Sequence, residues 1–246
     1  MRNWLALSAA CLLTWAPPAF SYRPFDLTDA DIVDEGEFEL ELGPVGYVHK
    51  GSDGFLIAPA VVGNLGIGGE REIVLEGKLS TPLNNTAGPQ TVLEDTALFL
   101  KQLHRRGSLQ DGSGISIASE CGVLLPEIHG ESGTGASCVG IVSQRWPATT
   151  VHLNVGFALD REHNWNRTLG AIMEGPREWM IRPALELIAE RNTSGAWTNS
   201  ALVGVIWPAQ EHLSFDFGVR ATRSDDQNSY EIRAGLTWGF SLEKNK

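Results

Sequence analysis

The chain has 246 residues, enough for one or two domains, and its 30 acidic against 19 basic residues give a net charge of −11. This balance argues against nucleic acid as a partner, because phosphate binding needs a basic patch. The 27 glycines, together with a charged fraction of only 20%, favour short β segments separated by turns.

The first 21 residues have the features of an export signal. One arginine precedes an apolar stretch from Leu5 to Ala16, which is shorter than the roughly 20 residues that a membrane helix needs. Small residues follow, so we expect a signal peptide over 1–21 that is cleaved after Ser21. A lipoprotein signal that ends at Cys11 is the alternative.

Residues 22–35 are acidic and precede the first alternating segment. We predict that they form a periplasmic lead-in, or a short segment tucked into the mouth of a barrel.

From residue 36 onward, apolar and polar residues alternate in short runs that are separated by turn-forming residues. Successive side chains of a strand point to opposite faces, so each run has one apolar and one polar face. The clearest runs are 36–43, 72–79, 151–160, 181–190, 212–220 and 230–240. The less regular runs are 55–63, 95–103, 114–125, 137–146, 167–174 and 197–207.

An even number of strands, each about 9–11 residues long, is typical of single-chain barrels that cross the bacterial outer membrane. We therefore predict an all-β fold, a single antiparallel transmembrane β-barrel of about 12 strands over 36–240, with a short C-terminal tail over 241–246. Tryptophans near predicted strand ends support membrane interfaces at both rims. They are Trp146, Trp179, Trp197, Trp207 and Trp238. A soluble antiparallel domain, whose apolar face packs on a second sheet, is the alternative.

In a barrel of this kind the polar face lines the lumen, and it carries both signs of charge. The predicted lumen-lining residues are Glu72, Glu76, Lys78, Lys101, Glu120, His152, Asn154, Arg182, Glu186, Glu190, Asp216, Arg220, Glu231 and Arg233. Such a set either attracts charged solutes or forms a structural ion-pair network, because buried carboxylates usually pair with cations.

Two cysteines, Cys121 and Cys138, flank a predicted hairpin loop, and an oxidising periplasm permits a disulfide between them. Two unpaired thiols are the alternative. No cysteine or histidine spacing typical of a metal site occurs, so we expect no metal and no cofactor.

A membrane-embedded hydrolase would require a serine, a histidine and a polar orienting group that converge. His152 faces inward, but Ser116 and Ser119 lie on a separate strand without a G-x-S-x-G setting. We therefore expect no catalytic residue and no enzyme activity.

Several short motifs recur in order along the chain. They are Glu37, Glu39 and Glu41, then Asn64-Leu65-Gly66-Ile67, then His152, Asn154 and Gly156, then Glu186 and Glu190, and finally Gly235-Leu236-Thr237. In this succession the chain resembles the outer-membrane β-barrel family named for the meta-pathway of phenol degradation. The chain differs from the pattern at Gly63, where an aromatic is usual, and in the tail after Phe240. The resemblance implies an outer-membrane barrel for small, often hydrophobic, compounds, without catalytic residues.

The sequence thus predicts an exported barrel of a Gram-negative outer membrane that gives passive passage to, or binds, small solutes through a charged lumen. Its expected partners are outer-membrane lipid, an unidentified small-molecule solute and the periplasmic barrel-assembly machinery. The alternatives are a membrane-embedded enzyme and a soluble periplasmic binding domain.

Overall fold

The computed structural model describes residues 23–84, 90–193, 195–224 and 227–242. The predicted signal peptide lies outside these residues, as do residues 243–246 of the predicted tail.

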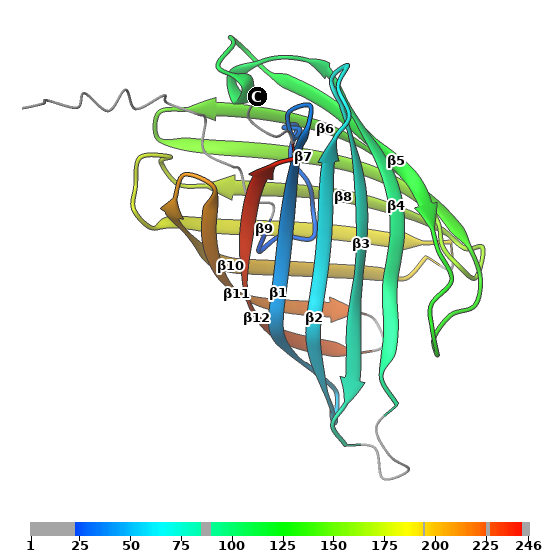
Figure 1. The fold of residues 1–246 in the computed structure, drawn as a ribbon. Helices are drawn as coiled ribbons and strands as arrows, with labels where there is room; N and C mark the ends of the chain where they lie inside the picture. The colour runs from blue at the N-terminus through cyan, green and yellow to red at the C-terminus, as the bar shows by residue number, and fades with distance from the viewer. Residues whose placement is uncertain (1–22, 85–89, 194, 225–226, 243–246) are drawn as a thin grey trace, which may run out of the picture.

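Twelve antiparallel strands close into one barrel, in which each strand pairs with its neighbours in sequence and β12 pairs with β1 (Figure 1). The strands are β1 (Glu37–Lys50), β2 (Asp53–Gly66), β3 (Arg71–Pro82), β4 (Val92–Arg105), β5 (Ser116–Leu124), β6 (Gly135–Trp146), β7 (Thr149–Leu159), β8 (Trp165–Glu174), β9 (Arg182–Asn192), β10 (Trp197–Gln210), β11 (Leu213–Ser224) and β12 (Asn228–Ser241). The predicted fold class is confirmed. Several strands are longer than predicted, up to 14 residues, because pairing continues to the rims of the barrel.

The strands of the front and back walls cross at a steep angle. In Figure 1, β1 to β4 stand upright in front, while the yellow and green strands of the back wall run across the view. Strand tilt and right-handed twist in a closed sheet produce this crossing.

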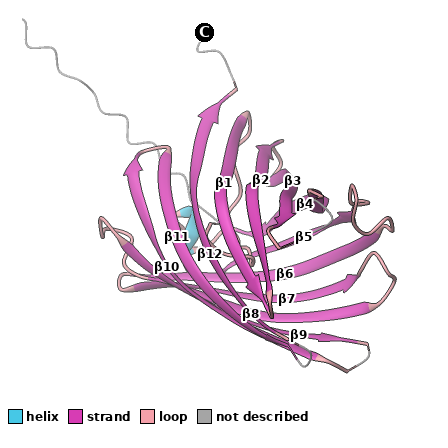
Figure 2. Cartoon of the chain, turned by 90° about the horizontal axis from the view of Figure 1, so that it is seen from below, coloured by secondary structure: helices cyan, strands magenta, loops and turns pink. Residues whose placement is uncertain are grey.

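Both ends of the barrel sheet lie at one rim, where Leu242 N–H donates to the carbonyl of Gly36 over 2.8 Å. We call this the terminal rim; it carries the turns at 67–70, 106–115, 147–148, 175–181 and 211–212. The opposite, distal rim carries the remaining loops. In the longest turn of the terminal rim lies the short helix η1 (Ser108–Gln110), drawn in cyan in Figure 2. No helix in the described residues is long and apolar enough to span a membrane.

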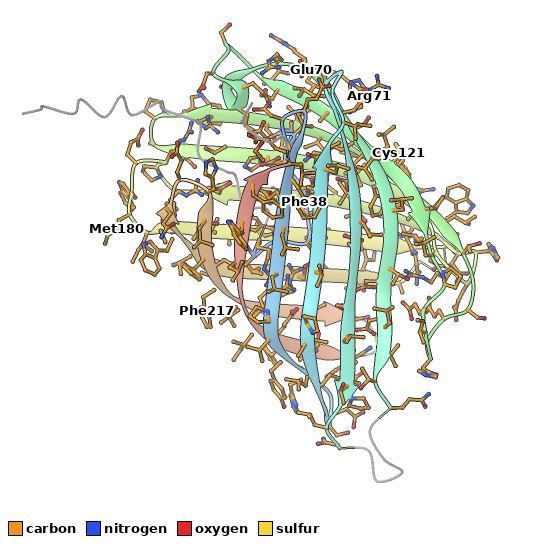
Figure 3. All side chains as sticks on the ribbon, in the orientation of Figure 1. Phe38, Glu70, Arg71, Cys121, Met180 and Phe217 are labelled. Atoms are coloured by element: carbon orange, nitrogen blue, oxygen red, sulfur yellow. A yellow bond between two sulfur atoms is a disulfide. The ribbon has the colours of Figure 1, made fainter. Side chains whose placement is uncertain are left out.

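Burial in this barrel is the reverse of burial in a soluble sandwich. Large apolar residues face outward and are exposed, such as Leu75 at 56% and Val203 at 64%. Charged residues face inward and are buried, such as Lys101 at 0% and Glu72 at 1%. Figure 3 shows Phe217 and Met180 projecting away from the barrel. An apolar outer belt around a polar interior matches a barrel whose outer face meets lipid.

Tryptophans mark the two edges of this apolar belt. Trp197 begins β10 at the distal rim, together with Trp165 at the start of β8, which the sequence reasoning did not single out. The other tryptophans of the predicted girdle lie near the terminal rim, and all are exposed on the outer face. They are Trp146, Trp179, Trp207 and Trp238.

Cys121 of β5 and Cys138 of β6 lie directly opposite each other in the register and form a disulfide. Both side chains face outward, and Figure 3 shows Cys121 on the outer surface of the barrel. The bridge therefore staples one hairpin without entering the lumen.

Register shifts follow one another across neighbouring strands in the distal half of the front wall. They lie between Leu42 and Val45 in β1, between Ile57 and Ala60 in β2, and near Gly77 in β3. Bulges bend the strands that contain them. The bent wall forms one side of the distal cavity described below.

Candidate functional site

The N-terminal residues 23–35 lie inside the barrel, and we call them the lumen segment. Ala30 is fully buried, and Leu27 and Asp29 are nearly so. In Figure 1 this blue stretch lies behind β1 and β2 before the chain turns into β1. Two alternatives were predicted for this stretch, a periplasmic lead-in or a short segment in the barrel mouth, and the structure places residues 23–35 within the lumen.

Side chains of the barrel wall hold the backbone of the lumen segment. Glu186 Oε1 on β9 accepts from the N–H groups of Asp26 and Leu27 over 2.9 and 2.8 Å. Asn154 on β7 accepts from Thr28 N–H over 3.3 Å and donates to the Thr28 carbonyl over 2.8 Å. An irregular segment must satisfy its backbone groups in this way when it leaves water.

Two further wall residues continue this pattern toward the terminal rim. Ser143 Oγ accepts from Ala30 N–H over 3.0 Å, and Glu72 Oε2 accepts from Val33 N–H over 2.6 Å. Gln110, in the turn that contains η1, donates to the Ala30 carbonyl over 2.9 Å. The long turn that the sequence left without a role therefore caps the lumen segment.

Glycines on the inner wall make room for the lumen segment. A Cβ at Gly170 would lie 2.2 Å from a methyl group of Leu27, and a Cβ at Gly235 would lie 2.1 Å from the Arg23 side chain. Any larger residue at Gly170 or Gly235 would therefore force the side chain of Leu27 or Arg23 to move.

Ion pairs join the distal part of the lumen segment to the wall. Asp26 lies 2.7 Å from Arg220 and 2.6 Å from Arg233. Arg220 also pairs with Glu186, and Arg233 pairs with Glu231 over 2.6 Å. These wall residues belong to the predicted lumen set, and Asp26 is the partner that the sequence did not reveal.

A second cluster of ion pairs lies nearer the terminal rim. The fully buried ammonium of Lys101 lies 3.5 Å from Asp29 and 3.4 Å from Glu72. Elsewhere on the segment, Arg23 pairs with Asp216 over 3.3 Å. Both clusters therefore pair a charge of the lumen segment with charges of opposite sign on the wall.

The other predicted lumen residues have separate roles on the wall. Lys78 pairs with Asp95 over 2.6 Å, and Glu190 accepts from Thr168 over 3.3 Å near the distal rim. Glu76 and Glu120 line the distal cavity.

A hydrogen-bonded row connects Ser143, His152 and Glu174. His152 Nδ1 lies 2.8 Å from Ser143 Oγ, and its Nε2 lies 3.1 Å from Glu174, which also pairs with Arg182 over 3.2 Å. The order of serine, histidine and carboxylate is that of a serine hydrolase triad, but the two ring nitrogens are interchanged, since Nδ1 faces the serine and Nε2 faces the carboxylate. However, Ser143 Oγ is already engaged by Ala30 N–H, and the three residues line neither cavity described below. The row therefore serves as an anchor for the lumen segment in this arrangement.

The lumen segment separates two cavities. The distal cavity, of about 500 Å³, is bounded by Arg23 and Phe25 to Thr28 of the segment and by charged wall residues such as Glu76 and Arg233. The terminal cavity, of about 170 Å³, is bounded by Asp31 to Asp34. Between them, Ala30 packs with Leu103, Ala118 and Ile141 without exposed surface. The barrel therefore has a distal vestibule and a smaller terminal cavity, with the buried contacts of Ala30 between them and Asn64 in the lining of both.

Asp31 faces the terminal cavity and lies outside the strands. Burial, and then the neighbouring charge of Asp29, raise the pKa of Asp31 to about 7, although Gln110 donates to its carboxylate over 3.0 Å. In the described residues, no group of three or more His, Cys, Asp or Glu side chains is arranged to hold a metal ion.

No family model and no curated protein matches this chain, so membership of the phenol meta-pathway family stays a prediction. Solved structures of similar fold include a KdgM porin, with 12% identity and a TM-score of 0.54 over 83% of this chain and 99% of that chain. An outer membrane channel from Pseudomonas putida F1 has 11% identity and a TM-score of 0.59, covering 88% of this chain and 100% of that chain. The CymD monoaromatic hydrocarbon channel has 7% identity and a TM-score of 0.50, covering 87% and 90%. The chain thus has the fold of outer-membrane barrel channels.

Proposed function

We propose that this protein is a channel of the bacterial outer membrane that passes small solutes passively and is closed by its own lumen segment. The observation that carries the proposal is the division of the lumen into two cavities by residues 23–35. The terminal rim then lies in the periplasm, because barrels of this class keep both termini on that side.

Release of the lumen segment opens the path. The segment is held only by hydrogen bonds, ion pairs and short apolar contacts with the wall. Cleavage after Ser21, as the sequence predicts, leaves the segment as a chain end that can withdraw. The wall groups that it leaves then face water, which replaces the lost hydrogen bonds.

The vestibule favours a solute that combines an apolar body with a polar or charged group. Its lining includes Val62 and Val74 beside Glu76 and Arg233. Apolar walls with a few polar groups are typical of small-molecule sites. The structural neighbours include a channel described as one for monoaromatic hydrocarbons, which agrees with a small solute of this kind.

Planar-bilayer conductance tests the proposal. We expect the full mature chain to open rarely, and a variant that lacks residues 23–33 to conduct steadily. A matched variant, in which a Gly-Ser chain of equal length replaces 23–33, keeps the bulk but loses the wall contacts and should also conduct. Equal conductance of all three proteins contradicts the proposed closure. Absence of any conductance contradicts the channel itself.

The Ser143–His152–Glu174 row supports one rival function, a hydrolase that works after the segment withdraws. Hydrolysis of a nitrophenyl ester by the variant without residues 23–33 distinguishes the two. The rival predicts hydrolysis that His152→Gln abolishes. The channel proposal predicts none above background.

A further inference from the structure

Three arginines occupy outward positions near the distal rim, away from the lumen. They are Arg167 of β8, Arg191 of β9 and Arg223 of β11, and all are exposed. Arg167 and Arg191 lie directly opposite each other in the register. Like charges in directly opposed positions destabilise a sheet. In the described parts of the chain, no carboxylate forms an ion pair with any of the three, so the repulsion is not balanced within the described protein.

The arginines lie at the level of the aromatic edge of the apolar belt. The Arg191 guanidinium lies 5.4 Å from the ring centroid of Trp197, which begins β10. Asn199 of β10 pairs with Arg223 on one side and with Ala189 on the other, so Arg223 lies two residues along the strands from the row of Arg191. Two strand spacings and an offset of two residues separate the two backbone positions by about 12 Å, which two long arginine side chains can reach across.

An apolar groove begins beside Arg223 and continues toward mid-barrel. It has a volume of about 690 Å³ and includes Arg223 in its lining. Small outward residues form its floor, between the larger side chains of Leu169, Leu187 and Tyr230. The floor residues are Ala171, Ala189, Ala201 and Ala221.

We propose that this patch binds a phosphate-bearing lipid of the outer leaflet, with its phosphate between the arginines and an acyl chain in the groove. Guanidinium groups match phosphate oxygens in a bidentate fashion. The chain carries a net charge of −11, so a cluster of cations at one rim is not explained by its overall balance. The groove supplies the apolar half of the same amphiphilic ligand, which a free anion lacks.

Lipid retention by the full mature protein in detergent, measured by native mass spectrometry, tests the proposal. The probes are diphosphorylated lipid A and the same lipid without its phosphates. We expect the phosphorylated form to bind at least about tenfold more tightly, because hydrogen bonds between guanidinium groups and phosphate oxygens are charge-assisted and stronger than neutral ones. Joint substitution of Arg167→Gln, Arg191→Gln and Arg223→Gln should abolish this preference.

The matched control removes three exposed arginines from the terminal rim, with Arg71→Gln, Arg105→Gln and Arg106→Gln, and should keep the preference. The proposed site is overturned if both triple variants lose the preference for phosphorylated lipid A equally. It is also overturned if the variant at Arg167, Arg191 and Arg223 keeps that preference. Competition by inorganic phosphate at the lipid concentration also overturns it.

A second variant tests the groove without changing charge. Ala201→Phe fills the floor of the groove and should weaken the binding of both lipid A probes several-fold. This variant therefore tests the lipid site even where the arginine variant does not assemble. Unchanged lipid binding by the Ala201→Phe variant would contradict the placement of an acyl chain in the groove. Conductance should be unaffected by the substitutions at Arg167, Arg191 and Arg223 and by Ala201→Phe, because the patch lies outside the lumen. The conductance experiment on the lumen segment therefore tests the proposed closure separately from lipid binding.

Discussion

Replacing Asn154 with alanine should free the lumen segment without changing any charge. Asn154 makes two hydrogen bonds with the backbone of Thr28, one as acceptor and one as donor. A neutral hydrogen bond contributes about 0.5–1.5 kcal/mol net, so the docked state should lose about 2 kcal/mol when water enters the space that the amide leaves. At 1.4 kcal/mol per tenfold change, the released fraction should rise about 30-fold.

Thiol labelling measures this release. Thr28→Cys supplies the reporter at small cost, since the buried Thr28 hydroxyl has no hydrogen-bond partner among the described residues. A bulky maleimide should react slowly at this position while the segment is docked. In the Asn154→Ala background, the labelling rate should increase by about the same 30-fold factor as the released fraction.

The matched control is Asn64→Ala, another buried asparagine of the lumen wall. Asn64 donates to Glu41 over 3.1 Å and makes no hydrogen bond to the described lumen segment. Its removal should leave the labelling rate nearly unchanged. The reasoning is refuted if Asn154→Ala labels at the parent rate, or if Asn64→Ala accelerates labelling equally. Boiling-dependent gel mobility confirms that each variant still forms a barrel.

Three further predictions concern the pKa of Asp31, the room that Gly170 leaves for Leu27, and the two faces of β12. The raised pKa of Asp31, about 7, means that the docked state binds more protons than the released state between about pH 4 and 7. Docking should therefore weaken as pH rises from about 4 to 7, so labelling and conductance should increase from pH 5 to 7 and level off above it, and Asp31→Asn should reduce that dependence. Gly170→Val should force Leu27 aside and give conductance close to that of the deletion variant, while a gel still shows a heat-modifiable barrel. Leu236→Arg, on the lipid face, should destabilise the barrel folded into vesicles by about 2–4 kcal/mol. Arg233→Leu should leave assembly intact and increase labelling at position 28. Equal tolerance of both substitutions would contradict the assignment of the two faces.

The strands were predictable because period-two alternation is a local property of the sequence. In β12, Ile232 and Leu236 alternate with Arg233 and Thr237, and that order alone assigns the two faces. Export and the tryptophans then indicated lipid outside, and the inverted burial agrees. Pro183 correctly argued for a strand at β9, because a helix tolerates an interior proline poorly.

The lumen segment was not predictable in the same way. Residues 23–35 have no periodicity, and their partners come from strands spread over the whole chain, including β3, β7 and β9. Ser143 is one ordinary serine in an alternating run, and nothing local marks it as an acceptor for Ala30. The available signal was indirect: an acidic stretch precedes a barrel whose inner face carries arginines on neighbouring strands, such as Arg220 and Arg233.

The chemistry of these contacts explains why the segment is better suited to a gate than to a permanent core. An apolar plug would expose a large apolar surface on release, at about 25 cal/mol per Å². Here many of the contacts are polar, and Glu186 and Asn154 would be solvated in an open lumen instead of being left unsatisfied. Exchange of protein partners for water makes each contact individually weak. Several weak contacts at fixed positions define one docked geometry while keeping release accessible to a change in pH or to a solute in the vestibule.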